Sequence, residues 1–169
     1  MGRCVTLAKR NRPIMAHFLG EHNGKLDPKN RVVLPSALLK QMSPDAMNQV
    51  VLKKGLGKFL VVYPLNVWLK TIDEISKINQ FNPQASEFRR RFLMGASSPM
   101  DLDSASRFLV PKNMLEHAGL KKDVVLLGDI DKIELWDREE YERYLQNPDI
   151  DEAALAAQVL GKEVSGGHL

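Results

Sequence analysis

The stretch LDPKNRVVLP, at residues 26–35, recurs in altered form as LDSASRFLVP at residues 102–111. The aspartates of the two copies are 76 positions apart (103 − 27), and so are their arginines (107 − 31). A repeat of this kind indicates that one structural unit occurs twice in the chain. Asp-Pro-Lys-Asn has the composition of a tight turn, and the β-branched run after it is typical of a strand.

Each copy opens a unit of the same order: strand, turn, strand, short helix, β-hairpin and longer helix. Neither unit has enough strands for an independent core, so we expect the two to interleave into one small β-barrel. The predicted class is α+β, with a mainly β core and flanking helices. Strands are expected within residues 17–26, 31–34, 49–53, 59–63, 97–103, 107–110, 123–128 and 132–136, and helices at 37–42, within 64–95, at 111–118, from 137 and at 149–160.

This order predicts five segments along the chain. The first is basic and is not followed by an apolar run, which argues against a secretory signal. The segments are a basic N-terminal extension (1–15) that we expect to be disordered, module 1 (16–68), a helical linker (69–95), module 2 (96–146) and a C-terminal helix and tail (147–169).

Composition limits the class of protein. Hydrophobic residues make up 44% of the chain and charged residues 27%, which are ordinary values for a soluble globular protein. No apolar run approaches the roughly 18 residues that a membrane helix needs. The net charge of +3 is compatible with a polyanionic partner. The single cysteine, Cys4, allows no disulfide within the chain and fits a reducing cytoplasm.

The order D-x-x-x-R, V-V-L-P and then Y-P-L-x-x-W at residues 63–68 resembles the MraZ family of bacterial transcriptional regulators. EHAGL at residues 116–120 and ELWD at 134–137 extend the resemblance over about residues 15–147. It implies two tandem AbrB-like swapped-hairpin modules in one pseudo-twofold β-barrel, and chains that assemble as a homo-oligomeric ring. It also implies a cytoplasmic, nucleoid-associated regulator of the division and cell-wall gene cluster, which binds short repeated promoter elements in double-stranded DNA.

Five residues in or next to the two turns are the predicted DNA contacts. Arg31 and Arg107 carry guanidinium forks that suit the O6 and N7 acceptors of guanine. Lys25 and Lys29 are point charges that suit phosphates. Asn30 lies at the tip of the first turn, between the lysine and the arginine.

Asp27 and Asp103 are expected to orient these arginines. The pattern by itself equally allows a plain ion pair across each turn, repeated because the unit is repeated. The two interpretations are compatible, because a paired aspartate can hold its arginine in an orientation that reaches a base.

The two turns depart from the D-x-K-G-R form that is usual in the family. Asn30 takes the glycine position of the first copy, a mild change because asparagine also adopts positive φ. Residues 104–106 of the second copy lack both the lysine and the glycine. We therefore expect the second turn to differ in conformation, and the first copy to be the stronger DNA reader.

Other conspicuous residues have simpler explanations. For the basic run Arg89-Arg90-Arg91, a solvated helix surface or a contact with a neighbouring subunit is favoured over a phosphate clamp. Core packing is favoured over base stacking for the aromatic residues at the strand-to-helix junctions, which are Tyr63, Trp68, Trp136 and Tyr141.

No enzyme is expected. The chain has no Walker loop, G-x-G-x-x-G or G-x-S-x-G motif, and its scattered histidines make no credible zinc site. We thus predict no catalytic residue, metal, cofactor, small-molecule substrate or membrane partner. The alternative function is an antitoxin-like or scaffold protein-interaction module with secondary DNA contact, for which the apolar segment 153–160 is the candidate docking element.

Overall fold

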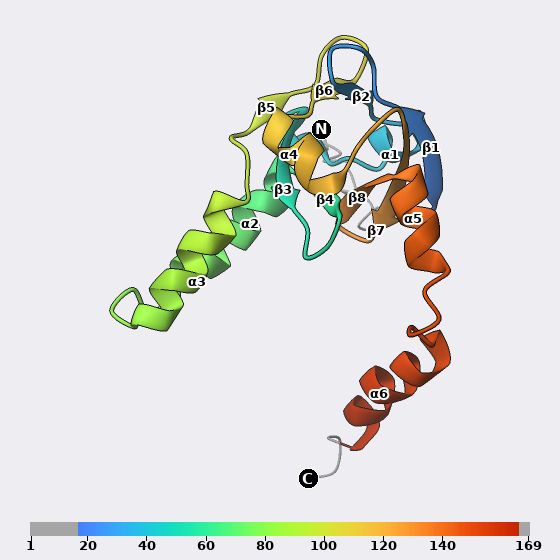
Figure 1. Ribbon diagram of the computed structural model, residues 1–169. Coiled ribbons are helices and arrows are strands. Elements are labelled where there is room, and N and C mark those ends of the chain that lie inside the picture. The colour runs from blue at the N-terminus through green and yellow to red at the C-terminus, as the bar shows by residue number, and fades with distance from the viewer. Residues whose placement is uncertain (1–16, 166–169) are drawn as a thin grey trace, which may run out of the picture.

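The computed structural model describes residues 17–165 and confirms the α+β class (Figure 1). The extension expected at residues 1–15 and the end of the predicted tail, 166–169, lie outside the described residues. The strands are β1 (Glu21–Lys25), β2 (Arg31–Val33), β3 (Gln49–Lys54), β4 (Phe59–Pro64), β5 (Met100–Asp101), β6 (Arg107–Leu109), β7 (Asp123–Asp129) and β8 (Lys132–Asp137). The helices are α1 (Ser36–Leu39), α2 (Leu65–Ser76), α3 (Pro83–Met94), α4 (Lys112–Ala118), α5 (Arg138–Leu145) and α6 (Glu152–Ser165), with a 3-10 turn at Pro44–Ala46.

Six of these strands form one antiparallel sheet, in the order β1-β7-β8-β4-β3-β5. The second strands of the two hairpins, β4 and β8, lie side by side in its middle. β1 of the first half pairs with β7 of the second, and β5 of the second half pairs with β3 of the first. Each half therefore completes the other half's part of the sheet.

The strands that follow the two turns, β2 and β6, pair with each other as a separate antiparallel ribbon. Figure 1 shows this ribbon and its turns at the top of the molecule, above the sheet. Val32 and Phe108 lie opposite each other at its centre and are fully buried. They share one hydrophobic cluster with Leu52 and Leu126 of the sheet, so the main core lies between the ribbon and the sheet.

The expectation of one closed β-barrel is wrong for residues 17–165. The sheet stays open, because its outer strands, β1 and β5, do not pair with each other. β5 has two residues and follows Pro99, whose nitrogen carries no hydrogen, so this edge is too short to close a ring. The helices after the ribbon strands close the core instead, through Leu38 of α1 and Met114 of α4.

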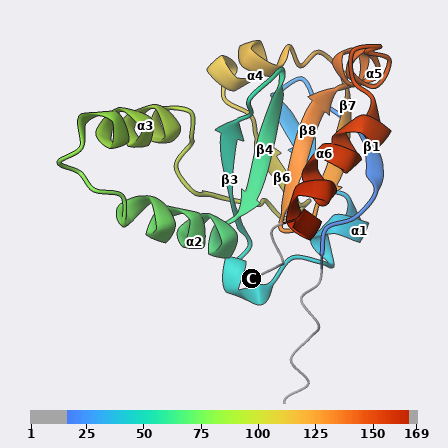
Figure 2. The same ribbon diagram turned by 90° about the horizontal axis from the view of Figure 1, so that it is seen from below.

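The two helices of the linker, α2 and α3, lie beside each other as an arm that points away from the sheet (Figure 2). Trp68 of α2 stacks on Phe92 of α3, with ring centroids 5.8 Å apart. The side chain of Asn82 accepts hydrogen bonds from the N–H groups of Gln84 and Ala85, and thereby caps α3 as the Asn-Pro pattern predicts. Helix α6 follows α5 at the end of the chain, with its described side chains exposed.

Candidate nucleic-acid interface

The first D-x-x-x-R turn is organised by the carboxylate of Asp27. Its Oδ1 accepts hydrogen bonds from the backbone N–H groups of Lys29 (2.9 Å) and Arg31 (2.8 Å). Its Oδ2 accepts one from Nε of Arg31, at 2.8 Å. The N–H of Asn30 donates to the carbonyl of Asp27 at 3.0 Å, and Asn30 takes the positive φ, 60°, that its place in the motif predicts.

The second turn has the same conformation, so the expected difference between the two turns is wrong. Asp103 Oδ1 accepts from the N–H groups of Ala105 and Arg107 at 2.9 Å, and Oδ2 accepts from Nε of Arg107 at 2.8 Å. Ser106 adopts a φ of 58° in the place of Asn30. The aspartate supplies the acceptors that hold the chain in this shape, which explains why the turn forms without the glycine or the lysine.

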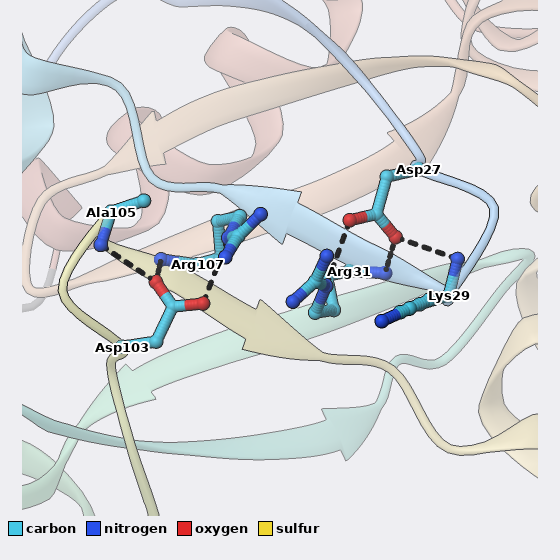
Figure 3. Close-up of polar contacts among 6 residues, drawn as sticks. All are labelled: Asp27, Lys29, Arg31, Asp103, Ala105 and Arg107. Carbon is cyan, nitrogen blue, oxygen red and sulfur yellow. Dashed lines mark hydrogen bonds and ion pairs between the residues drawn. The ribbon is translucent and has the colours of Figure 1, made fainter.

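The ribbon brings the two turns together on one surface. Figure 3 shows the arginines of the two turns on adjacent strands, each beside its own aspartate. The N–H of Leu34 donates to the carbonyl of Ser106, and the N–H of Val110 to that of Asn30, both at 2.8 Å. Each turn is thus bonded to the strand that leaves the other turn, and residues 76 positions apart lie in equivalent places.

Each arginine is held by one edge of its guanidinium group. Among residues 17–165, Arg31 and Arg107 form their side-chain hydrogen bonds through Nε alone, which leaves the Nη groups available as donors. Their side chains are 28% and 31% exposed. A fixed, partly exposed guanidinium with free Nη hydrogens can donate two parallel hydrogen bonds to a base edge or a phosphate.

The two aspartates remain ionised at neutral pH. Hydrogen bonds from the backbone N–H groups of Arg31 and Arg107 are the largest cause that lowers the pKa of Asp27 and of Asp103, respectively, and the arginine side chains add to this effect. The ion-pair interpretation is therefore correct as geometry. It leaves the outer edge of each guanidinium group open to a further partner.

The two ends of the ribbon differ in charge, because the predicted lysine contacts occur in the first copy alone. Lys25 at the end of β1 and Lys29 in the first turn are exposed, and neither forms an ion pair within residues 17–165. The equivalent places in the second copy hold Asp101 and Ala105. Asp101 accepts a hydrogen bond from the Gln49 side chain at 2.9 Å. The first end thus offers more positive charge than the second.

The other conspicuous residues lie away from the ribbon. Arg90 and Arg91 pair with Glu87 of their own helix, at 2.6 and 2.8 Å, which fits the prediction of a helix surface. Core packing is confirmed for the aromatic residues. Trp68 is buried against Val51 and Leu65, and half-buried Tyr63 packs against this cluster. Trp136 and Tyr141 are buried against Val125.

Neither a metal site nor a membrane-spanning helix is found in the part of the chain that the structure describes. No group of three or more His, Cys, Asp or Glu side chains in residues 17–165 is placed to hold a metal ion. No helix within this range has the length and apolar character to cross a membrane.

Comparison with known proteins identifies the family. The family model described as "MraZ protein, putative antitoxin-like" matches residues 17–91 and again residues 92–161. The chain belongs to the MraZ family. The family that the turns and the Y-P-L-x-x-W junction resemble is thus confirmed, and the double match follows the 76-residue repeat.

Curated MraZ relatives match over most of their length. "Transcriptional regulator MraZ" of Christiangramia forsetii is 33% identical over 150 residues, which cover 88% of this chain and 96% of the relative. The protein of the same name from Clostridium beijerinckii is 36% identical over 145 residues, covering 85% of this chain and 99% of the relative.

Two exposed residues of the β2–β6 ribbon were not predicted as site residues from the sequence. Val33 and Leu109 each lie two positions after the arginine of their own turn, and their side chains are exposed on the face that carries Arg31 and Arg107. The alternation of side chains along a strand is a signal that could have placed them there. It could not have shown that nothing within residues 17–165 buries them.

Proposed function

We propose that this MraZ-family chain is a sequence-specific, DNA-binding transcriptional regulator of the division and cell-wall gene cluster. It binds short repeated promoter elements through its two D-x-x-x-R turns. One observation carries the proposal: the ribbon sets two aspartate-anchored arginines, from distant parts of the chain, side by side with free donor groups. Relatives that the chain matches over nearly their full length are named as transcriptional regulators.

In this mechanism the β2–β6 ribbon enters the major groove of DNA, which is wide enough for two strands. Arg31 and Arg107 donate Nη hydrogens to the O6 and N7 atoms of guanines. Lys25 and Lys29 bind phosphates beside the first turn, and Asn30 approaches the DNA backbone at its tip. The side chains that point into the core, led by Val32 and Phe108, keep the ribbon rigid during binding.

The chain acts as a homo-oligomer, in a ring that lets successive subunits engage repeated DNA elements. The exposure of large apolar side chains on the α2–α3 arm supports a contact between copies: Phe81 is 86% exposed and Phe88 51%. The exchange of β1 and β5 between halves supports the swapped-hairpin architecture of AbrB-like modules. The regulator works in the cytoplasm, associated with the nucleoid, and needs no cofactor.

Footprinting on the DNA directly upstream of the protein's own gene tests this function. Wild type should protect evenly spaced short repeats. Arg31→Ala should lose this protection, because it removes a bidentate base contact worth about 1–3 kcal/mol in each subunit. The variant should still fold and keep its oligomer size, with a slightly lower thermal midpoint because its ion pair with Asp27 is lost. Arg31→Lys keeps the charge but lacks the fork, so it should restore little of the protection.

Lys70→Ala is the matched control, since it removes one positive charge from an exposed position on α2. It should leave the footprint intact. If Arg31→Ala binds the same fragment with unchanged affinity, the role assigned to this arginine is wrong.

A second candidate function is an antitoxin-like or scaffold module that binds another protein. Helix α6 favours it, because Leu155, Val159 and Leu160 are 47–61% exposed. A pull-down with the full chain and with a chain that ends at residue 148 tests this role, next to a gel shift on the upstream DNA. A partner that binds only the full chain, together with no DNA shift by that chain, would favour the second candidate.

A further inference from the structure

The outward face of the ribbon holds four side chains, and two of them are apolar. Val33 and Leu109 are 50% and 54% exposed. In the strand register, Leu109 lies opposite Arg31, and Val33 lies opposite Arg107. The face therefore alternates between an arginine and an aliphatic side chain both along each strand and across the pair.

The placement of these two side chains between the arginines, rather than their exposure alone, distinguishes them from single exposed residues such as Leu56. They occupy equivalent positions in the two copies, so the feature occurs twice within one chain. The β-propensity of valine explains an exposed Val33, but leucine is not among the strong strand formers, so propensity leaves Leu109 unexplained. The guanidinium groups beside them select a partner that is negatively charged and also offers apolar groups.

Double-stranded DNA meets both requirements in its major groove. The 5-methyl group of thymine is the apolar group displayed there, and aliphatic side chains recognise it by contact. A protein surface that buried Val33 and Leu109 would have to desolvate two partly exposed arginines whose Nη groups have no partner within residues 17–165, which is unfavourable.

We propose that Val33 and Leu109 are specificity-determining residues that contact thymine methyl groups next to the bases bound by Arg31 and Arg107. This inference rests on the proposed DNA-binding function. Leu109 extends one carbon further than Val33, so the two ends of the ribbon reach thymines at different depths. The arginines of the ribbon thus bind hydrogen-bonding groups of the bases, and the aliphatic side chains contact methyl groups next to them.

The test uses the upstream DNA fragment prepared in two forms, one with thymine and one with uracil in every place of thymine. Uracil pairs as thymine does but lacks the methyl group. Wild type should bind the uracil form more weakly, by about fourfold for each methyl group that it no longer touches. Val33→Ala with Leu109→Ala should discriminate between the two forms much less than wild type does, because the shortened side chains lose most of their contact with the methyl groups.

Leu56→Ala is the matched control, because Leu56 is a fully exposed leucine at the tip of the β3–β4 turn. It should keep the wild-type ratio between the two forms. The double alanine variant should also keep the wild-type dependence of affinity on salt, since its phosphate-binding side chains are unchanged. Thermal unfolding of each variant reports on the fold.

Three results separate this inference from the function on which it rests. Equal binding of the two DNA forms by wild type, with the footprint and its loss in Arg31→Ala intact, overturns the methyl contacts and leaves the function standing. A double variant that folds and keeps the wild-type ratio between the two DNA forms overturns them as well. No preference of wild type for the upstream fragment over a shuffled sequence overturns the function and this inference together.

Discussion

At the scale of single residues, each turn depends on one aspartate that performs two tasks. Two backbone N–H groups bind Oδ1 and shape the turn, while Nε of the arginine binds Oδ2 and sets the direction of the guanidinium group. The second copy repeats these bonds around Asp103 although its three middle residues differ. The turn and its donor group therefore form around aspartate and arginine at this spacing with either set of middle residues.

The lowered pKa values of Asp27 and Asp103 predict how stability depends on pH. A carboxylate with a lowered folded-state pKa contributes stability that is complete above its ordinary value, 3.8, and is lost as pH falls through the lower folded value. Asp27→Asn with Asp103→Asn should therefore be less stable than wild type at about pH 6, and should lose less stability on going to about pH 2.

Urea unfolding over this pH range measures the effect. Asp45→Asn, at an exposed position before β3, serves as the control and should follow wild type. A double variant whose stability falls with acid as steeply as that of wild type would show that other groups govern acid unfolding.

At the scale of elements, the ribbon is a small unit that depends on its surroundings. Each strand has three residues, too few for an isolated hairpin to be stable in water. Buried Val32 and Phe108 fix it to the core, and the turns fix its ends. Its pseudo-symmetry is incomplete, since Lys29 of the first turn corresponds to Ala105 of the second.

Ala105→Lys should strengthen DNA binding and make its dependence on salt steeper. The N–H of Ala105 bonds to Asp103 as that of Lys29 bonds to Asp27, so a lysine fits this backbone. One added phosphate contact changes the slope of log affinity against log salt by about −0.9, and Lys29→Ala should change it by the same amount in the opposite sense. Titrations on the upstream fragment at several salt concentrations measure both slopes.

Gln84→Lys, on the helical arm, adds the same charge away from the ribbon and should leave the slope near that of wild type. If Ala105→Lys also keeps the wild-type slope, the second turn does not approach phosphate in the complex.

At the scale of the whole molecule, the two halves are joined by exchange of strands. β1 belongs to the first half by sequence but pairs with β7, and side chains of α5 bind it as well. Arg138 donates to the side chain of Asn23 at 2.6 Å, and the hydroxyl of Tyr141 donates to Glu21. The β2–β6 ribbon, which carries Arg31 and Arg107, likewise takes one strand from each half.

Because of this exchange, neither half should fold as a monomer. We expect fragments 17–91 and 92–161 to lack a cooperative unfolding transition when each is dilute and monomeric, and to form one when they are mixed. Circular dichroism with sedimentation analysis measures both. A monomeric fragment with a sharp thermal transition would show that the exchanged strands are dispensable for folding.

The sequence allowed most of the helices and strands to be predicted, together with the turn at Asn30. The prediction of a closed β-barrel was wrong. The sequence predicted a longer strand at residues 97–103, and only the pairing with β3 shows that β5 has two residues. The predicted difference in conformation between the two turns was also wrong, because the hydrogen bonds of Asp103 shape the second turn without a glycine. Which candidate residues bind DNA stays a prediction.

The sequence by itself determined those features whose hydrogen bonds span a few residues, such as the aspartate-anchored turns and the cap at Asn82. The tertiary structure alone decided that Arg31 and Arg107 meet on one face, and that Val33 and Leu109 remain exposed between them. Local bonds depend on neighbours that the chain always keeps close, whereas strand partners 76 residues apart are selected by burial of a shared core.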